Sequence, residues 1–218
     1  MKKKSKLIPS MIKDERLIEQ RRQQIIEGAV RLFVKKGFYK TTTREIAKEC
    51  GLSIGTMYEY IQTKEDVLYL VCEYIHSELE KRLLKVMNEE DSGIESLLKS
   101  LKKLFCAMDE MRSLVLLIYQ ETKSLPRDKM KYVLSKEEEI TNLFVRILEK
   151  GMKDGTIQID ASSINLMAHN IMVIGQMWTF RHWALGREYD LEEFTKRQMS
   201  LLLGQFTAGG EWNAGDPT

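Results

Sequence analysis

Apolar residues recur every three or four positions along most of this 218-residue chain. This spacing places them on one face of an α-helix, as in helices that pack around a shared core. Glycines, prolines and polar segments divide the pattern, which predicts an all-α protein of about nine helices. We expect these helices near residues 15–36, 43–50, 53–60, 63–88, 94–108, 111–125, 127–150, 160–184 and 191–206.

The second and third of these helices form a candidate helix-turn-helix over residues 43–62, TREIAKECGLSIGTMYEYIQ. Ile46 lies on the packing face of the first helix, and Gly51 stands at the turn, where a positive φ favours glycine. Ser53 is placed to cap the second helix, and Met57 and Tyr60 face back onto the first. Several packing constraints therefore coincide in one short segment.

The outward face of the second helix is small and mostly uncharged, which suits a helix that enters the major groove of DNA. It carries Ile54, Gly55, Thr56, Tyr58 and Glu59. An ordinary corner between two helices follows the same packing rules without binding nucleic acid. The segment alone therefore leaves both interpretations open.

The distribution of charge favours DNA binding. The whole chain carries a net charge of only +2, but residues 1–64 contain 15 Lys or Arg against 7 Asp or Glu, a net +8. The remainder of the chain carries −6. Basic charge beside the motif is what binding to phosphates requires.

These contrasts predict four parts of the chain. We expect a flexible basic arm at 1–14 and a helix-turn-helix DNA-binding domain at 15–62. A helical effector-binding and dimerisation domain would follow at 63–206, with the helix at 63–88 as the connector, and a loose tail at 207–218. Two domains of opposite charge indicate two tasks.

The residues that could carry other chemistry are few. Cys50, Cys72 and Cys106 are odd in number and widely spaced, which fits reduced thiols in a cytoplasm. Cys72 and His76 lie four positions apart, but two ligands without a third do not form a metal site, so no metal or other cofactor is expected. The sequence contains no glycine-rich phosphate loop, nucleophile motif, signal peptide or membrane span. We therefore expect a cytoplasmic protein that is not an enzyme.

Residues 25–68 resemble the DNA-binding region of the TetR family of transcriptional regulators. The similarity is carried by AVRLFVKKGFYKTTTREIAKECGLSIGTMYEYIQTKEDVL, residues 29–68. Two positions depart from the family pattern, because Cys50 replaces a usual alanine and Ile61 a usual phenylalanine. The resemblance implies an all-helical homodimer, commonly of nine helices, with an effector pocket among the fifth to seventh helices and a dimer interface on the eighth and ninth.

The resemblance also implies which residues meet the DNA. Those at the start of the recognition helix would approach base edges, and the hydroxyl and basic side chains around it would meet phosphates. The expected DNA-binding residues are Thr42, Thr43, Arg44, Ser53, Ile54, Gly55, Thr56, Tyr58, Tyr60 and Lys64.

The C-terminal part is expected to bind a small-molecule effector. The segment QETKSLP, residues 120–126, resembles regulators of acyl-CoA and fatty-acid metabolism, so the expected effector is largely apolar, such as an acyl-CoA or a fatty acid. Bulky residues with a few polar groups make up the candidate pocket: Phe105, Met108, Tyr119, Gln120, Phe144, Asn170, Ile174 and Trp178. Residues 178–183 could instead belong to the dimer interface, where aromatic side chains and arginine concentrate.

The functional prediction is a dimeric repressor that a small molecule releases from a palindromic operator in double-stranded DNA. An activator, or a DNA-binding module without an effector, would contain the same helix-turn-helix. The sequence does not identify the operator, the effector or the regulated genes.

Overall fold

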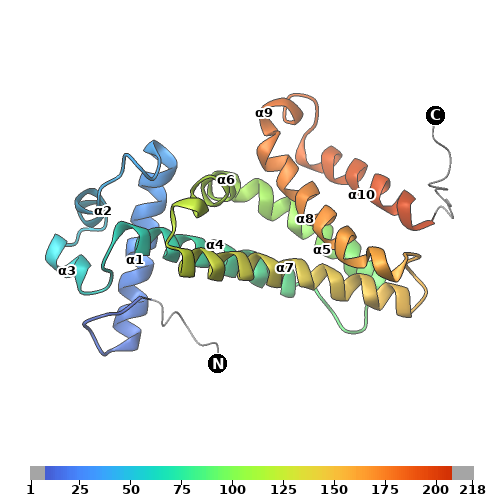
Figure 1. Ribbon diagram of the computed structural model, residues 1–218. Coiled ribbons are helices and arrows are strands. Elements are labelled where there is room, and N and C mark those ends of the chain that lie inside the picture. Colours follow the sequence, from blue (N-terminus) through green and yellow to red (C-terminus); the bar gives the residue numbers. More distant parts are fainter. Residues whose placement is uncertain (1–7, 208–218) are drawn as a thin grey trace. The chain divides into compact units, whose positions relative to one another are not determined.

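The computed structural model describes residues 8–207 and confirms the all-α fold. These residues form ten α-helices and two 3₁₀ turns and contain no strand (Figure 1). The helices are α1 (Glu15–Lys36), α2 (Thr43–Glu49), α3 (Ile54–Tyr58), α4 (Lys64–Leu84), α5 (Gly93–Glu110), α6 (Arg112–Glu121), α7 (Arg127–Lys153), α8 (Ile164–Phe180), α9 (His182–Leu185) and α10 (Leu191–Thr207). The 3₁₀ turns are η1 (Thr122–Ser124) and η2 (Ala161–Ser163).

The helices group into two compact units. The first contains the chain up to Lys81 together with 111–140, and the second contains 82–110 together with the residues from 141 on. Both α4 and α7 therefore contribute to both units. The helix-turn-helix and α6 belong to the first unit, although most of the chain between them belongs to the second.

The first unit is built around a buried apolar cluster. Phe33 of α1, Ile46 of α2 and Met57 of α3 are almost completely buried in it, as are Val67 and Leu68 of α4. The same cluster contains side chains from the later segment: Met111, Leu117, Leu125 and Val133. The start of α7 and the helix-turn-helix therefore share one core.

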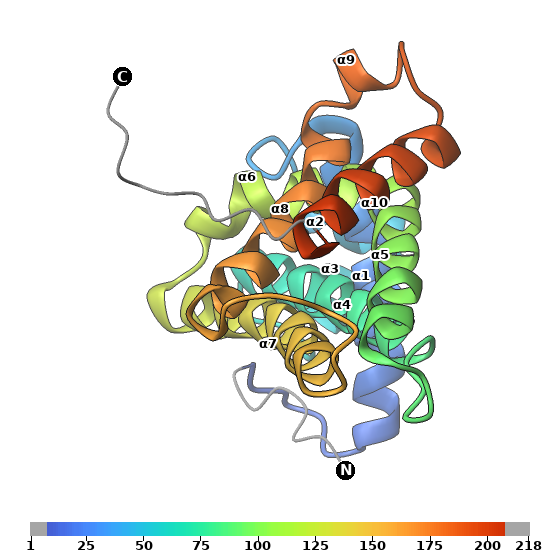
Figure 2. The ribbon, with the colours of Figure 1, turned by 90° about the vertical axis from the view of Figure 1, so that its right-hand side faces the viewer.

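The second unit packs α5 against both α8 and α10 (Figures 1 and 2). Trp178 of α8 and Phe105 of α5 meet Phe194 of α10, with ring centroids 4.6 and 5.4 Å from the Phe194 ring. The indole Nε1 of Trp178 donates a hydrogen bond to Asp109 Oδ1 at 2.8 Å. The polar part of this buried tryptophan is therefore satisfied inside the unit.

The predicted helix at 160–184 is wrong as a single element. Asp160 caps the turn η2, where its side chain accepts from Ser162 N, and α8 begins only at Ile164. Arg181, with φ −107° and ψ 10°, leaves the helical conformation after α8, and α9 follows as a separate helix. The apolar pattern continues across this break, so periodicity did not reveal it, and the described chain has ten helices rather than nine.

Two other helices end earlier in the sequence than predicted. α4 ends at Leu84 rather than near residue 88, and α6 ends at Glu121, where the chain tightens into η1 before Pro126. Frayed and tightened last turns are common, because the final carbonyls lack helical partners. α1 and α10 lie where they were expected.

The described part of the expected arm at 1–14 is held against the first unit. Ile8 is buried, and its carbonyl accepts from Arg22 Nη2 at 2.8 Å. Met11 N and Ser10 Oγ donate to the Glu59 carbonyl at 3.0 and 2.9 Å. The rest of that arm, 1–7, and most of the expected tail at 207–218, from 208 on, lie outside the described residues.

None of the described helices is both long and apolar enough to cross a lipid bilayer.

Gly28 permits a close approach of α2 to α1. A Cβ atom at Gly28 would lie 2.4 Å from Cys50 Sγ, far inside normal contact distance. On the other side of that contact, Cys50 Sγ donates to the Gln24 carbonyl at 3.3 Å. The two helices are therefore matched in volume at this point.

The substitution Gly28→Ala should lower the free energy of unfolding by about 1–3 kcal/mol, because the added methyl group overpacks the contact with Cys50. The double variant Gly28→Ala/Cys50→Ala should regain most of this loss. Urea unfolding at a fixed protein concentration measures both. Gly204→Ala is the matched control, since no atom lies within 4 Å of a Cβ at that exposed helical position. Equal losses for Gly28→Ala and the double variant would contradict the proposed contact.

Candidate DNA-binding interface

Helix α2 begins with a complete capping box. Thr42 Oγ1 accepts from Glu45 N at 3.3 Å, and the Glu45 carboxylate accepts from Thr42 N at 2.9 Å. Each side chain thereby satisfies a backbone N–H that has no helical partner. The box fixes where α2 starts, and so where Thr43 and Arg44 lie.

The Glu45 carboxylate also pairs with Lys36 Nζ at 2.6 Å. The Lys36 ammonium first, and then the Thr42 backbone and hydroxyl, lower the pKa of Glu45 from its ordinary 4.5 to about 2. Because the folded pKa is depressed, the stabilisation from this group is complete above pH 4.5. It is lost as the pH falls through about 2.

Helix α3 is positioned by the turn before it. Gly51 has φ +67°, as the sequence predicted, and turns the chain sharply after α2. Ser53 Oγ accepts from Thr56 N at 3.0 Å and caps α3. Met57 is completely buried and anchors the helix from its inner side.

The expected contact residues of α3 lie at its start and on its outer side. Ser53 and Gly55 are exposed, while Ile54 and Thr56 are half-buried. A Cβ at Gly55 would meet only Ser53 Oγ, at 3.7 Å, so the backbone here is open to a close approach. These features suit a helix whose first turn faces base edges.

A pair of hydroxyl groups joins α2 and α3 on their exposed side. Tyr58 OH and Thr43 Oγ1 lie 3.2 Å apart, and the Tyr58 side chain is 41% exposed. Arg44, next to Thr43, is exposed, and its side chain forms no hydrogen bond or ion pair with any described residue. Two hydroxyl donors and a guanidinium of this kind can bind phosphate oxygens.

Two of the expected DNA-binding residues make contacts within the first unit, and for Tyr60 the sequence had predicted core packing as well. Tyr60 is only 3% exposed and packs in the core of the first unit. Lys64 Nζ donates to the Phe38 carbonyl at 3.0 Å and lies 4.2 Å from the centre of the Phe38 ring. Lys64 thus ties α4 to the loop between α1 and α2.

Two further exposed residues, Tyr39 and Lys40, lie in this region and were not among the expected DNA-binding residues. Tyr39 is largely exposed, and its hydroxyl lies 2.7 Å from Ser124 Oγ in the turn η1. Lys40, the next residue, is also exposed, just before the capping box. The only signal in the sequence was their place beside the three threonines at 41–43.

The expected effector residues are divided between the two units. Phe105, Met108, Phe144 and Trp178 are buried in the second unit, at most 2% exposed. On α8, Asn170 is exposed and Ile174 half-buried. Tyr119, 70% exposed, and Gln120 lie on α6 in the first unit. This set of effector residues stays a prediction. Of the two tryptophans in 178–183, which could line either the pocket or the dimer interface, Trp178 is buried in the core and Trp183 is largely exposed.

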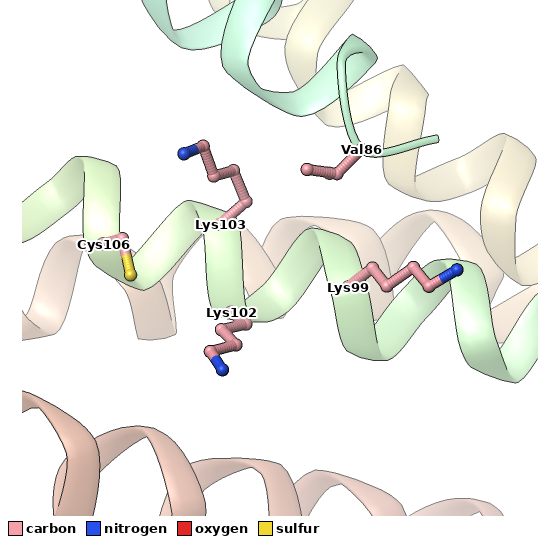
Figure 3. Close-up of a pocket in the computed structure, with 5 residues that line it drawn as sticks. All are labelled: Val86, Lys99, Lys102, Lys103 and Cys106. Atoms are coloured by element: carbon pink, nitrogen blue, oxygen red, sulfur yellow. The ribbon is translucent and has the colours of Figure 1, made fainter. Parts of the chain in front are cut away.

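The second unit contains an open pocket of about 400 Å³ along α5 (Figure 3). None of the eight expected residues lines it; its walls are Val86, Lys99, Lys102, Lys103 and Cys106. Figure 3 shows the lysine side chains pointing in different directions from α5. Lys99 Nζ pairs with Asp91 at 2.6 Å, whereas Lys102 and Lys103 have no hydrogen-bond or ion-pair partner among the described residues.

No cluster of metal ligands was found in residues 8–207. His76 Nδ1 lies 2.9 Å from the Cys72 carbonyl oxygen, which accounts for the spacing of these two residues. Burial raises the pKa of the Cys72 thiol to about 12.

The capped α2, the positive-φ turn and the exposed start of α3 form a helix-turn-helix of the kind found in DNA-binding proteins. Two family models match the chain: bacterial regulatory proteins of the tetR family over residues 25–69, and the tetracyclin repressor-like C-terminal domain over 90–181. The HTH-type transcriptional regulator HbdR of Aromatoleum sp. (strain CIB) is 31% identical over 208 residues, covering 94% of this chain and 89% of HbdR. The chain therefore belongs to the TetR family and is a DNA-binding transcriptional regulator.

Solved structures agree with this fold. A tetR-family regulatory protein from Rhodococcus RHA1 matches with a TM-score of 0.75 and 23% identity, over 87% of this chain and 98% of that one. AibR, solved in complex with isovaleryl coenzyme A and operator DNA, matches with a TM-score of 0.68 and 16% identity, over 83% and 97%.

The substitution Thr42→Ala should cost about 1 kcal/mol of unfolding free energy, because it removes the cap of α2. It should also raise the pKa of Glu45, because the hydrogen bond from the Thr42 hydroxyl is one of those that lower this pKa. Thermal unfolding and a carboxyl-selective NMR titration measure the two effects. Ser200→Ala, at an exposed helical position, should change neither. A Glu45 pKa that stays near 2 in Thr42→Ala would show that the Thr42 hydroxyl does not contribute to it.

Proposed function

We propose that this protein is a homodimeric repressor that leaves a palindromic operator when a small molecule binds its C-terminal domain. Residues 15–62 are proposed as the DNA-binding domain and 63–206 as the effector-binding and dimerisation domain. The observation that carries the proposal is the exposed, capped start of α3 beside the Thr43–Tyr58 hydroxyl pair.

A dimer explains how a small reading surface gains specificity. α3 has five residues and reaches few base pairs by itself. Two copies related by a two-fold axis would place their recognition helices in successive major grooves, about 34–36 Å apart. The matching operator would be a palindrome.

The second unit supports dimer formation by its exposed apolar side chains. Leu166 and Val173 on α8, Trp183 on α9 and Leu201 on α10 are each between 59% and 66% exposed. Large apolar side chains that are exposed in a single chain can be covered when two copies associate. Arg181 lies 4.9 Å from the Trp183 ring and adds the arginine and aromatic character common in interfaces.

The proposed effector is an acyl compound with a phosphate-bearing head, such as an acyl-CoA. AibR, a protein of the same fold, was solved with isovaleryl coenzyme A. In this chain, Lys102 and Lys103 line the α5 pocket without a partner among residues 8–207, and they supply positive charge for phosphate groups. The effector releases the operator only if it binds one conformation of the dimer more tightly than the DNA-bound one.

Arg44→Gln should weaken binding to a cognate duplex and flatten its dependence on salt. One lost phosphate contact reduces the magnitude of the log–log slope by about 0.9. Fluorescence anisotropy across a series of salt concentrations measures the slope, with a duplex selected by the wild-type protein from a random pool as the probe. Lys85→Gln removes the same charge from an exposed position outside the helix-turn-helix and should leave the slope unchanged. Equal slopes for Arg44→Gln and wild type would remove Arg44 from the interface.

Lys102→Gln/Lys103→Gln should weaken binding of palmitoyl-CoA by at least about ten-fold, since each lost charged hydrogen bond is worth about 1.5–3 kcal/mol. Binding of palmitate should change little, because it lacks the CoA phosphates. Isothermal titration calorimetry compares the two ligands, with Lys196→Gln on α10 as the control for a lost exposed charge. If wild type binds neither ligand, the acyl effector is wrong while the DNA-binding function is untouched.

A further inference from the structure

A buried ion pair joins the beginning of α4 to the beginning of α7, inside the first unit. Lys129 Nζ, in the first turns of α7, contacts Asp66 Oδ1, in the first turn of α4. The two side chains are only 3% (Asp66) and 11% (Lys129) exposed. A buried pair of this kind is weak evidence for stability, since apolar residues of similar size often serve as well. The role of this pair is therefore better judged from the backbone that Asp66 holds in place.

Asp66 holds the backbone that follows the recognition helix. Its Oδ2 accepts from both Gln62 N and Thr63 N at 2.8 Å, while Thr63 Oγ1 accepts from Asp66 N at 3.1 Å. Gln62 and Thr63 are the residues between the buried Ile61 and α4. One carboxylate thus fixes the connection that leads from α3 into α4.

Burial by itself would raise the pKa of Asp66, but the hydrogen bonds from Lys129, Gln62 and Thr63 outweigh it, and the pKa is lowered overall. The carboxylate is therefore ionised near neutral pH, and both of its oxygens are occupied. Without Lys129, the buried negative charge would keep its backbone donors and its electrostatic interaction with Arg22, but it would lose the cation in direct contact with it. The Lys129 ammonium therefore stabilises the ionised Asp66 carboxylate in its buried position.

Other contacts join the segment 111–140 to the N-terminal part of the first unit. Tyr39 OH lies 2.7 Å from Ser124 Oγ, which connects the loop before α2 to the turn before α7. Tyr69 of α4 meets Tyr132 of α7, with ring centroids 5.6 Å apart. The segment 111–140 therefore forms one body with the helix-turn-helix, and the Asp66–Lys129 pair is its charged, directional contact.

We propose that the Asp66–Lys129 pair is a positioning element for operator recognition, through which α7 sets the placement of α3 although neither residue contacts DNA. The proposal rests on the function proposed above, in which α3 reads the operator. Non-specific DNA binding depends mainly on phosphate charge, whereas specific binding also requires base contacts in register. Loss of the pair should therefore reduce the preference for the operator more than the affinity for DNA in general.

The test compares Lys129→Met with Lys131→Met, an exposed lysine two positions further along α7 with no hydrogen-bond or ion-pair partner among the described residues. The probes are a duplex that the full-length wild-type protein selects from a random pool and a scrambled duplex of the same length. Circular dichroism and light scattering establish fold and oligomeric state. The measured quantity is the dissociation constant for the scrambled duplex divided by that for the selected duplex. A high ratio means a strong preference for the selected duplex.

In Lys129→Met this ratio should fall at least about ten-fold, with less than a two-fold change for the scrambled duplex. Lys129→Arg should restore most of the ratio, and Lys131→Met should match wild type. If Lys129→Met does not fold, Asp66→Asn/Lys129→Met replaces it, because it removes both charges and keeps an oxygen for the two backbone donors. This double variant should fold and show the same fall.

An unchanged ratio in a folded variant, or an equal loss for both duplexes, would overturn the proposal. So would failure of both variants to fold, because the pair would then serve the fold alone. A wild-type protein that selects no duplex would count against the proposed operator reading instead.

Discussion

The recognition surface depends on burying the inner faces of two helices that are too short to be stable alone. α2 has seven residues and α3 has five, whereas isolated helices below roughly 12–15 residues are marginal in water. Ile46 and Met57 are completely buried in the core that these helices share with α1 and α4. Every outward residue of the site takes its position from this inner packing.

The charges of the N-terminal part serve two purposes. Some, such as Arg44, face solvent and are available to phosphates. Others are used within the unit: Arg22 donates to the carbonyls of Ile8 and Tyr60, and Lys64 donates to Phe38. Net charge therefore indicates a DNA-binding part of the chain, but it does not show which cations meet DNA. Satisfying backbone carbonyls near the surface competes for the same side chains.

The compact units do not follow the order of the chain. The segment 111–140 shares the core of the helix-turn-helix, although 29 residues of the second unit, 82–110, precede it. Val133 and Leu125 pack in the cluster that contains Phe33 and Met57. In a regulator built in this way, a shift of the segment 111–140 would reach the recognition helix through the side chains that share this core.

The sequence alone determined the all-α class, the helix-turn-helix with its turn glycine and its serine cap, and the family. Each of these depends on local rules of spacing, capping and backbone conformation that twenty neighbouring residues can express. Tertiary structure alone decided that the helix at 160–184 breaks at Arg181, that Gly28 faces Cys50, and that Lys129 reaches Asp66. Such outcomes depend on which surfaces meet across long separations in the chain, and periodicity reports only that a face is buried, not what it is buried against.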